Sequence, residues 1–122
     1  MPRKKKYAPP AIADLPQHPF DSAEEAWFWF VRCQYVRREG ARLEGASSSF
    51  SRPCDPDDIY RAVISLRQGG LIRLAHLRVL ESFGVLGRSP DRRCHEEAPA
   101  FQLWTEALDR LTTILKRKGV LA

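Results

Sequence analysis

The chain has 122 residues, of which 43% are hydrophobic, and this balance is typical of one globular domain rather than of a disordered polymer. Its longest apolar run, residues 26–31, is far shorter than the ~20 residues that a membrane-spanning helix needs. The formal net charge is +5, but residues 1–6 carry four of these charges, so the remainder of the chain is nearly neutral.

Residues 1–19 combine five prolines with four basic residues and few large apolar groups, and this composition predicts a disordered arm. No apolar segment follows the basic residues, so a secretory signal is not indicated and we expect a cytoplasmic protein. The arm could follow DNA phosphates, or it could be a solubilising terminus without a specific role. The residues that would contact phosphates are Arg3, Lys4, Lys5 and Lys6. Residues 20–122 are then a single helical domain.

The first predicted helix runs from Asp21 to about Glu39. Asp21 and Glu24 have the spacing of a capping box, and Gly40 follows the end. The segment is apolar on most of its circumference, which indicates either a helix buried on most sides or one with a side in an oligomer interface. The interface candidates are Phe28, Trp29, Tyr35 and Val36. The simpler interpretation is that these side chains belong to the core.

Residues 40–54 form a long polar connection in which nothing identifies a catalytic loop. The second helix, Pro56 to Gln68, follows an acidic N-cap at Asp55 and ends at the pair Gly69-Gly70. Its apolar positions recur at helical spacing, which predicts one buried face. Because capping explains the aspartates at its start, we do not interpret them as a metal site.

The third helix is predicted from about Ile72 to Phe83, with Gly84 as its end. His76 falls on its apolar face, where a packed, hydrogen-bonded core residue is the simpler interpretation than a catalyst. Two short helices joined by a glycine turn are a common arrangement in DNA-binding proteins. We therefore expect a helix-turn-helix-like central pair.

The fourth helix is predicted from Pro99 to Lys118, because apolar residues recur along one face and Gly119 follows. Glu106 and Arg110 stand four residues apart and should pair on the opposite face. Four helices in one chain of this size predict an all-α, single-domain fold.

Basic residues are concentrated in two parts of the domain. Residues 61–93 contain seven arginines against two acids, and the last helix ends in three consecutive basic residues. Arginine suits phosphate recognition because its planar guanidinium offers several donors. If these parts share a surface, they would contact nucleic acid. The candidates in the domain are Arg73, Arg78, Arg88, Arg92, Arg93, Lys116, Arg117 and Lys118.

Motifs that indicate catalysis are missing from the sequence. It has no phosphate-binding loop, no nucleophile elbow and no local pairs of metal ligands. We therefore expect a protein that is not an enzyme and that uses no cofactor, metal or small-molecule substrate. The cysteines fit ordinary reduced thiols, since their spacing suggests no disulfide framework. A zinc site would have to collect Cys54, His76, Cys94 and His95.

Four segments carry a resemblance to known proteins: AEEAWFWF (23–30), RPCDPDDI (52–59), AHLRVLESFG (75–84) and LWTEALDRLTTILKRKGV (103–120). They resemble a group of small bacterial all-helical proteins of unassigned function, which implies no activity. Residues 76–84, with the turn behind them, are also loosely similar to the first helix and turn of some helix-turn-helix regulators. Such a regulator would need a recognition helix soon after Pro90, whereas the next helix is predicted only from Pro99.

Two hypotheses follow from the sequence. The first is a small transcription regulator that binds double-stranded DNA mainly through arginine–phosphate contacts. The alternative is a protein–protein interaction module, a homodimer or an adaptor, that uses the aromatic first helix.

Overall fold

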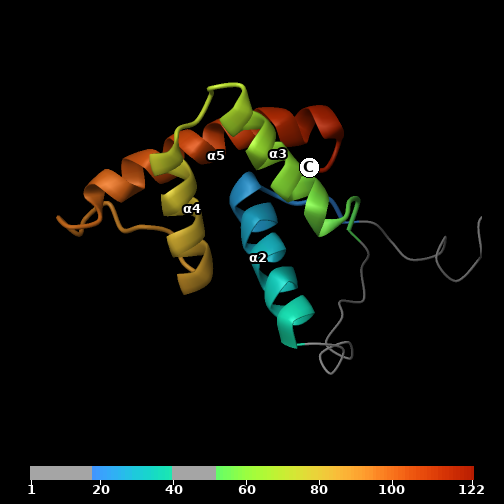
Figure 1. Cartoon of the computed structure of the whole chain (residues 1–122), viewed down its shortest axis with the longest axis horizontal. Coiled ribbons are helices and arrows are strands. Elements are labelled where there is room, and N and C mark those ends of the chain that lie inside the picture. Colours follow the sequence, from blue (N-terminus) through green and yellow to red (C-terminus); the bar gives the residue numbers. More distant parts are fainter. Residues whose placement is uncertain (1–17, 40–51) are drawn as a thin grey trace, which may run out of the picture.

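The computed structural model describes residues 18–39 and 52–122. They form four α-helices and no strand: α2 (Ala23–Glu39), α3 (Pro56–Gln68), α4 (Leu74–Leu86) and α5 (Ala98–Lys118) (Figure 1). The predicted all-α, four-helix fold is therefore confirmed. Almost all of the predicted arm at 1–19, and most of the predicted connection at 40–54, lie outside the described residues.

The longest helix, α5, runs across the molecule, and the other three helices pack against it. The helices α2 and α4 lie side by side and point away from α5 in the same direction (Figure 1). The central pair is present, with α3 and α4 joined by residues 69–73, where Gly70 has a φ of 78°. These two helices pack chiefly on α2 and α5 and contact each other little.

The core lies where the four helices meet. It contains almost every large apolar residue of the helix faces that the sequence predicts to be buried. Each helix contributes, and the segments beside the helices add further side chains. The largest fully buried side chains are Phe20, Ile59, Val63, Ile72, Leu80, Leu111 and Leu115.

The predicted N-caps can be compared with the observed starts of α3 and α2. The bounds of α3 agree with the prediction, and the backbone N–H of its N-cap, Asp55, donates to Asp58 Oδ2 at 3.1 Å. The predicted cap of α2 is wrong by one residue. Ser22 Oγ accepts the N–H of Glu25 at 3.1 Å, and Glu25 Oε1 accepts the N–H of Asp21 at 2.7 Å.

The predicted end of the third helix at Gly84 is also wrong. The helix α4 continues to Leu86 and ends at Gly87, whose φ of 78° suits glycine. Gly84 is buried at the crossing with α2, where a Cβ atom would lie 2.9 Å from both Trp27 Nε1 and Val31 Cγ2. This glycine therefore serves close helix packing rather than helix termination.

The start of the domain is attached to its other end through Phe20, which is fully buried. Its N–H donates to the carbonyl of Val120 at 2.9 Å, and its own carbonyl accepts the N–H of Ala122 at 2.8 Å. The guanidinium of Arg52 lies 4.4 Å from the centre of the Phe20 ring, a cation–π geometry. Residues 18–22, 52–54 and 119–122 thus form one packed corner.

Candidate nucleic-acid interface

His76 links the first turn of α4 to the middle of α5. Its Nδ1 accepts the backbone N–H of Arg73 at 2.9 Å, so the ring proton is on Nε2, which donates to Glu106 Oε1 at 2.8 Å. The side chain is buried, with 4% of the residue exposed. The prediction of a packed, hydrogen-bonded core histidine is confirmed. Because this histidine caps the helix, α4 starts at Leu74 rather than at Ile72.

The carboxylate of Glu106 is held by two donors, because Gln102 Nε2 also donates to it at 2.9 Å. The hydrogen bond from Gln102, then that from His76, lowers the pKa of Glu106. The predicted pair between the side chains of Glu106 and Arg110 is wrong, because Arg110 does not contact the carboxylate of Glu106. The guanidinium of Arg110 donates instead to the backbone carbonyl of Glu106 at 3.0 Å.

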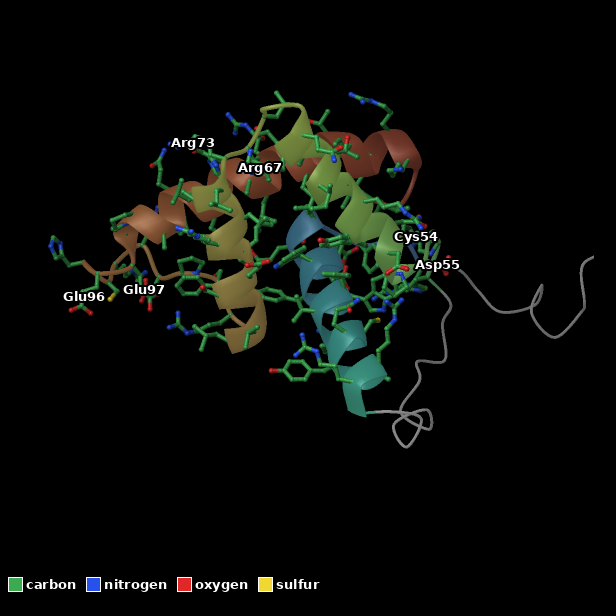
Figure 2. All side chains as sticks on the ribbon, viewed as in Figure 1. Cys54, Asp55, Arg67, Arg73, Glu96 and Glu97 are labelled. Carbon is green, nitrogen blue, oxygen red and sulfur yellow. The ribbon has the colours of Figure 1, made fainter. Side chains whose placement is uncertain are left out.

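The link between α4 and α5 places several arginines along one side of the molecule. Arg67 and Arg73 lie at the two ends of the α3–α4 turn, on the same edge of the molecule (Figure 2). Arg110 and Arg117 lie on α5 within about 40° of Glu106 around the helix axis, at ~100° per residue. Since His76 attaches the turn to Glu106, that line of α5 faces the same side. We call Arg67, Arg73, Arg110 and Arg117 the basic edge.

The predicted phosphate-contacting residues are spread over this surface rather than gathered in one cluster. Arg73 and Arg117 belong to the basic edge, and Lys116 and Lys118 are exposed beside it at the end of α5. Arg92 and Arg93 are exposed in the loop that precedes the other end of α5. The 21 residues of α5 extend about 30 Å, which separates the two groups. Arg3 to Lys6 lie outside the described residues.

Arg88 has an intramolecular role. Its guanidinium donates to both carboxylate oxygens of Glu97, at 2.9 and 2.8 Å, and lies 5.4 Å from the centre of the Phe83 ring. The hydrogen bonds from Arg88 and from the backbone N–H of Asp91 lower the pKa of Glu97 to about 2. This bidentate pair shapes the loop that carries Arg92 and Arg93, and it leaves Arg88 less available to a ligand.

Several carboxylates have side-chain partners, whereas most of the predicted basic side chains have none. Six carboxylates in the described residues accept hydrogen bonds from other side chains: Glu24, Glu25, Asp57, Asp58, Glu97 and Glu106. Seven of the predicted basic side chains form no hydrogen bond with another side chain in the part of the chain that the structure describes: Arg73, Arg78, Arg92, Arg93, Lys116, Arg117 and Lys118. The nearly neutral domain therefore contains a set of unpaired cations, and exposed carboxylates such as Glu81, Glu96 and Asp109 also lack a side-chain partner in the described residues.

The four interface candidates on α2 divide into two pairs. Phe28 packs on Trp104, with ring centres 5.6 Å apart, and Trp29 packs on Phe20 at 5.1 Å. Both are half-buried and are explained by packing within the molecule. Tyr35 and Val36 are 45% and 38% exposed, so they are the two that remain available to a partner.

The possible zinc ligands are not brought together. Cys54 lies at the start of α3 beside Lys118, whereas the backbone carbonyl of Cys94 accepts a hydrogen bond from the N–H of Glu97 at the opposite end of α5 (Figure 2). Burial, then the nearby Asp58 and Asp55, raises the pKa of Cys54 to about 11, which makes its thiol a poor nucleophile. Residues 18–39 and 52–122 contain no cluster of metal-ligating side chains.

None of the helices described has the length and apolar character to cross a membrane. Protein-family models, curated proteins and solved structures were all compared with the chain, and none matches it.

Proposed function

We propose that the protein is a small cytoplasmic regulator that binds double-stranded DNA through phosphate contacts. The observation that carries the proposal is the set of exposed cations without a carboxylate partner in the described residues, on the basic edge and at both ends of α5. Phosphate contacts supply most of the sequence-independent affinity of a DNA-binding protein. The proposal needs no base-reading helix, which is consistent with the small number of polar side chains exposed on α4.

The dimensions of the surface suit a duplex. The groups at the two ends of α5 are about 30 Å apart, close to the ~34 Å of one turn of B-form DNA. A duplex that lies along α5 would bring phosphates near Arg92 and Arg93 at one end and near Lys116 to Lys118 at the other. Arg73, which His76 and Glu106 hold beside the middle of α5, would contact the stretch between the two ends.

The test is a comparison of two charge reversals that change the net charge equally. The variant Arg73→Glu/Arg117→Glu removes two cations from the basic edge, and Arg32→Glu/Arg38→Glu removes two exposed cations from α2. We expect the first variant to bind a labelled duplex about tenfold or more weakly than the wild type at low salt. The second variant should bind almost as the wild type does, measured by fluorescence anisotropy.

Both variants should keep the helical circular dichroism of the wild type, because all four side chains are exposed and form no side-chain hydrogen bond with the described residues. Equal losses of affinity in the two variants would mean that total charge, not the basic edge, determines binding. No binding of the wild type to duplex DNA at low salt would refute the proposal.

The exposure of Tyr35 and Val36 favours a second candidate function, a protein–protein interaction module centred on the end of α2. Interface cores are enriched in aromatic side chains, and Tyr35 offers both apolar area and a hydroxyl group. The variant Tyr35→Ser/Val36→Ser tests it. Loss of self-association or of a bound partner without loss of helicity would support the module, and unchanged association would refute it.

A further inference from the structure

The outer face of α4 is exposed and has an unusual composition. Leu74, Arg78, Glu81 and Val85 fall within about 60° of one another around the helix, on the side opposite the buried His76 and Leu80. Leu74 is 44% exposed and Val85 is 62% exposed. Two large apolar side chains at the ends of the stripe thus enclose one cation and one anion.

The two charges on this face do not pair with each other. Arg78 and Glu81 stand three residues apart on one helix, yet neither has a side-chain partner among the residues described. The same spacing on α3 does give a pair, since Arg61 Nη1 lies 3.0 Å from Asp58 Oδ1. Both charges of the α4 face therefore remain available to another molecule.

The order of these residues is symmetric. Leu74 precedes Arg78 by four residues, and Val85 follows Glu81 by four. When two copies of α4 pack antiparallel about a two-fold axis between Arg78 and Glu81, each arginine faces the glutamate of the second copy. In the same arrangement each Leu74 faces Val85 of the second copy. An isologous contact requires a surface that is complementary to itself in this way.

We propose that the outer face of α4 is the contact of a two-fold homodimer, with Arg78 of each copy paired to Glu81 of the other. Leu74 and Val85 close the two ends of the contact and shield the ion pairs from water. Charge complementarity selects a second copy over an unrelated partner, because the stripe carries both members of each pair. The inference does not rest on DNA binding, and it assigns Arg78 to the dimer rather than to a phosphate.

The dimer should be weak and reversible. The 13 residues of α4 extend about 20 Å, and one helix from each copy buries less than the ~1,600 Å² of a standard interface. We therefore expect the mass in solution to rise with concentration from that of the 14.0 kDa monomer towards twice this value. Sedimentation velocity over a concentration series measures this rise.

A charge swap tests the pairing directly. Arg78→Glu places two acidic groups opposite each other across the axis, and Glu81→Arg places two basic groups there, so each single variant should remain monomeric. The double variant Arg78→Glu/Glu81→Arg restores opposite charges at both positions and should dimerise as the wild type does. The helical circular dichroism of all three should match the wild type, because these side chains are exposed and have no side-chain partner in the described residues.

A matched pair of apolar substitutions tests the location of the contact. Val85→Glu on α4 should abolish the dimer, whereas Val36→Glu on α2, a second exposed valine, should leave it unchanged. The proposal is overturned if the wild type stays monomeric at every concentration, if Arg78→Glu dimerises normally, or if the double variant fails to recover. Loss of the dimer in Val36→Glu but not in Val85→Glu would also overturn it, and would place the contact on α2.

Discussion

Two regions of the molecule differ in how their side chains are arranged. At the crossing of α2 with α4 the side chains are tightly packed, whereas along the basic edge they are exposed to solvent. At the crossing, Trp27 Nε1 donates to the carbonyl of Leu80 at 2.8 Å, and Gly84 leaves no space for even one added carbon. Along the basic edge, Arg73 and Arg117 are exposed to solvent without a side-chain partner in the described residues. Substitutions at the crossing should therefore change stability, and substitutions at the edge should change binding alone.

The largest effect is expected for Gly84→Val. A Cβ atom there would already lie 2.9 Å from Trp27 Nε1 and Val31 Cγ2, and valine adds two methyl groups. Overpacking of this kind should lower the free energy of unfolding by about 3 kcal/mol. Urea denaturation followed by circular dichroism measures the loss. The matched control is Ser82→Val, which adds the same residue at an exposed position of α4 and should change stability little.

Trp29→Ala should lower the free energy of unfolding by about 2 kcal/mol, because the Trp29 ring packs on Phe20. The expected loss is smaller than for a fully buried tryptophan, because Trp29 is only half-buried. Val36→Ala, on the exposed side of the same helix, should cost less than about 0.5 kcal/mol. Thermal melts of the two variants compare them. If Trp29→Ala melts like the wild type, then Trp29 is not part of the core and returns to the set of interface candidates.

His76→Leu should lower stability by about 1–2 kcal/mol. The substitution leaves the backbone N–H of Arg73 without its acceptor and removes one donor from the carboxylate of Glu106. The control is Gln102→Leu, which removes the other, more exposed donor of that carboxylate and should cost less. Equal melting temperatures for His76→Leu and the wild type would contradict the structural role of the histidine.

The smallest expected effect is on the pH dependence of the free energy of unfolding, through the pair of Arg88 and Glu97 in the loop before α5. The folded protein holds the pKa of Glu97 at about 2 instead of 4.5, so the pair with Arg88 stabilises the fold above pH ~4.5 and is lost as the pH falls towards 2. Glu97→Gln should therefore show a smaller decrease in urea midpoint over that interval than the wild type shows. An identical pH profile would mean that the pair contributes nothing to stability.

Local signals predicted most of the helices because their causes are local. The bounds of α3 follow from Asp55, Pro56 and the two glycines behind Gln68, and α5 ends where Gly119 takes a φ of 81°. The prediction at Gly84 was wrong because this glycine is required by the close packing of α2 on α4. Residues 72–84 contain no sequence signal for the contact with Trp27. The cap of α2 was displaced because Ser22 and Asp21 are adjacent and both are good capping residues.

The sequence predicted which type of residue forms the candidate site, but not which arginines are paired within the molecule or lie together. The sequence identified arginines as the residues of interest, yet it could not show that Arg88 is paired with Glu97 nine residues later. Arg67 and Arg110 were left out of the predicted set, and no sequence signal placed them beside Arg73. The position of Arg110 depends on the contact between His76 and Glu106, which joins residues 30 positions apart.

Whether the basic edge contacts DNA phosphates is best decided by the salt dependence of duplex binding. We expect the logarithm of the association constant to fall linearly with the logarithm of salt concentration. The magnitude of that slope should decrease by about two in Arg73→Gln/Arg117→Gln, one for each phosphate that is no longer neutralised. It should stay at the wild-type value in Arg32→Gln/Arg38→Gln. A slope that is the same in all three proteins, or a wild type whose binding ignores salt, would contradict DNA binding by the basic edge.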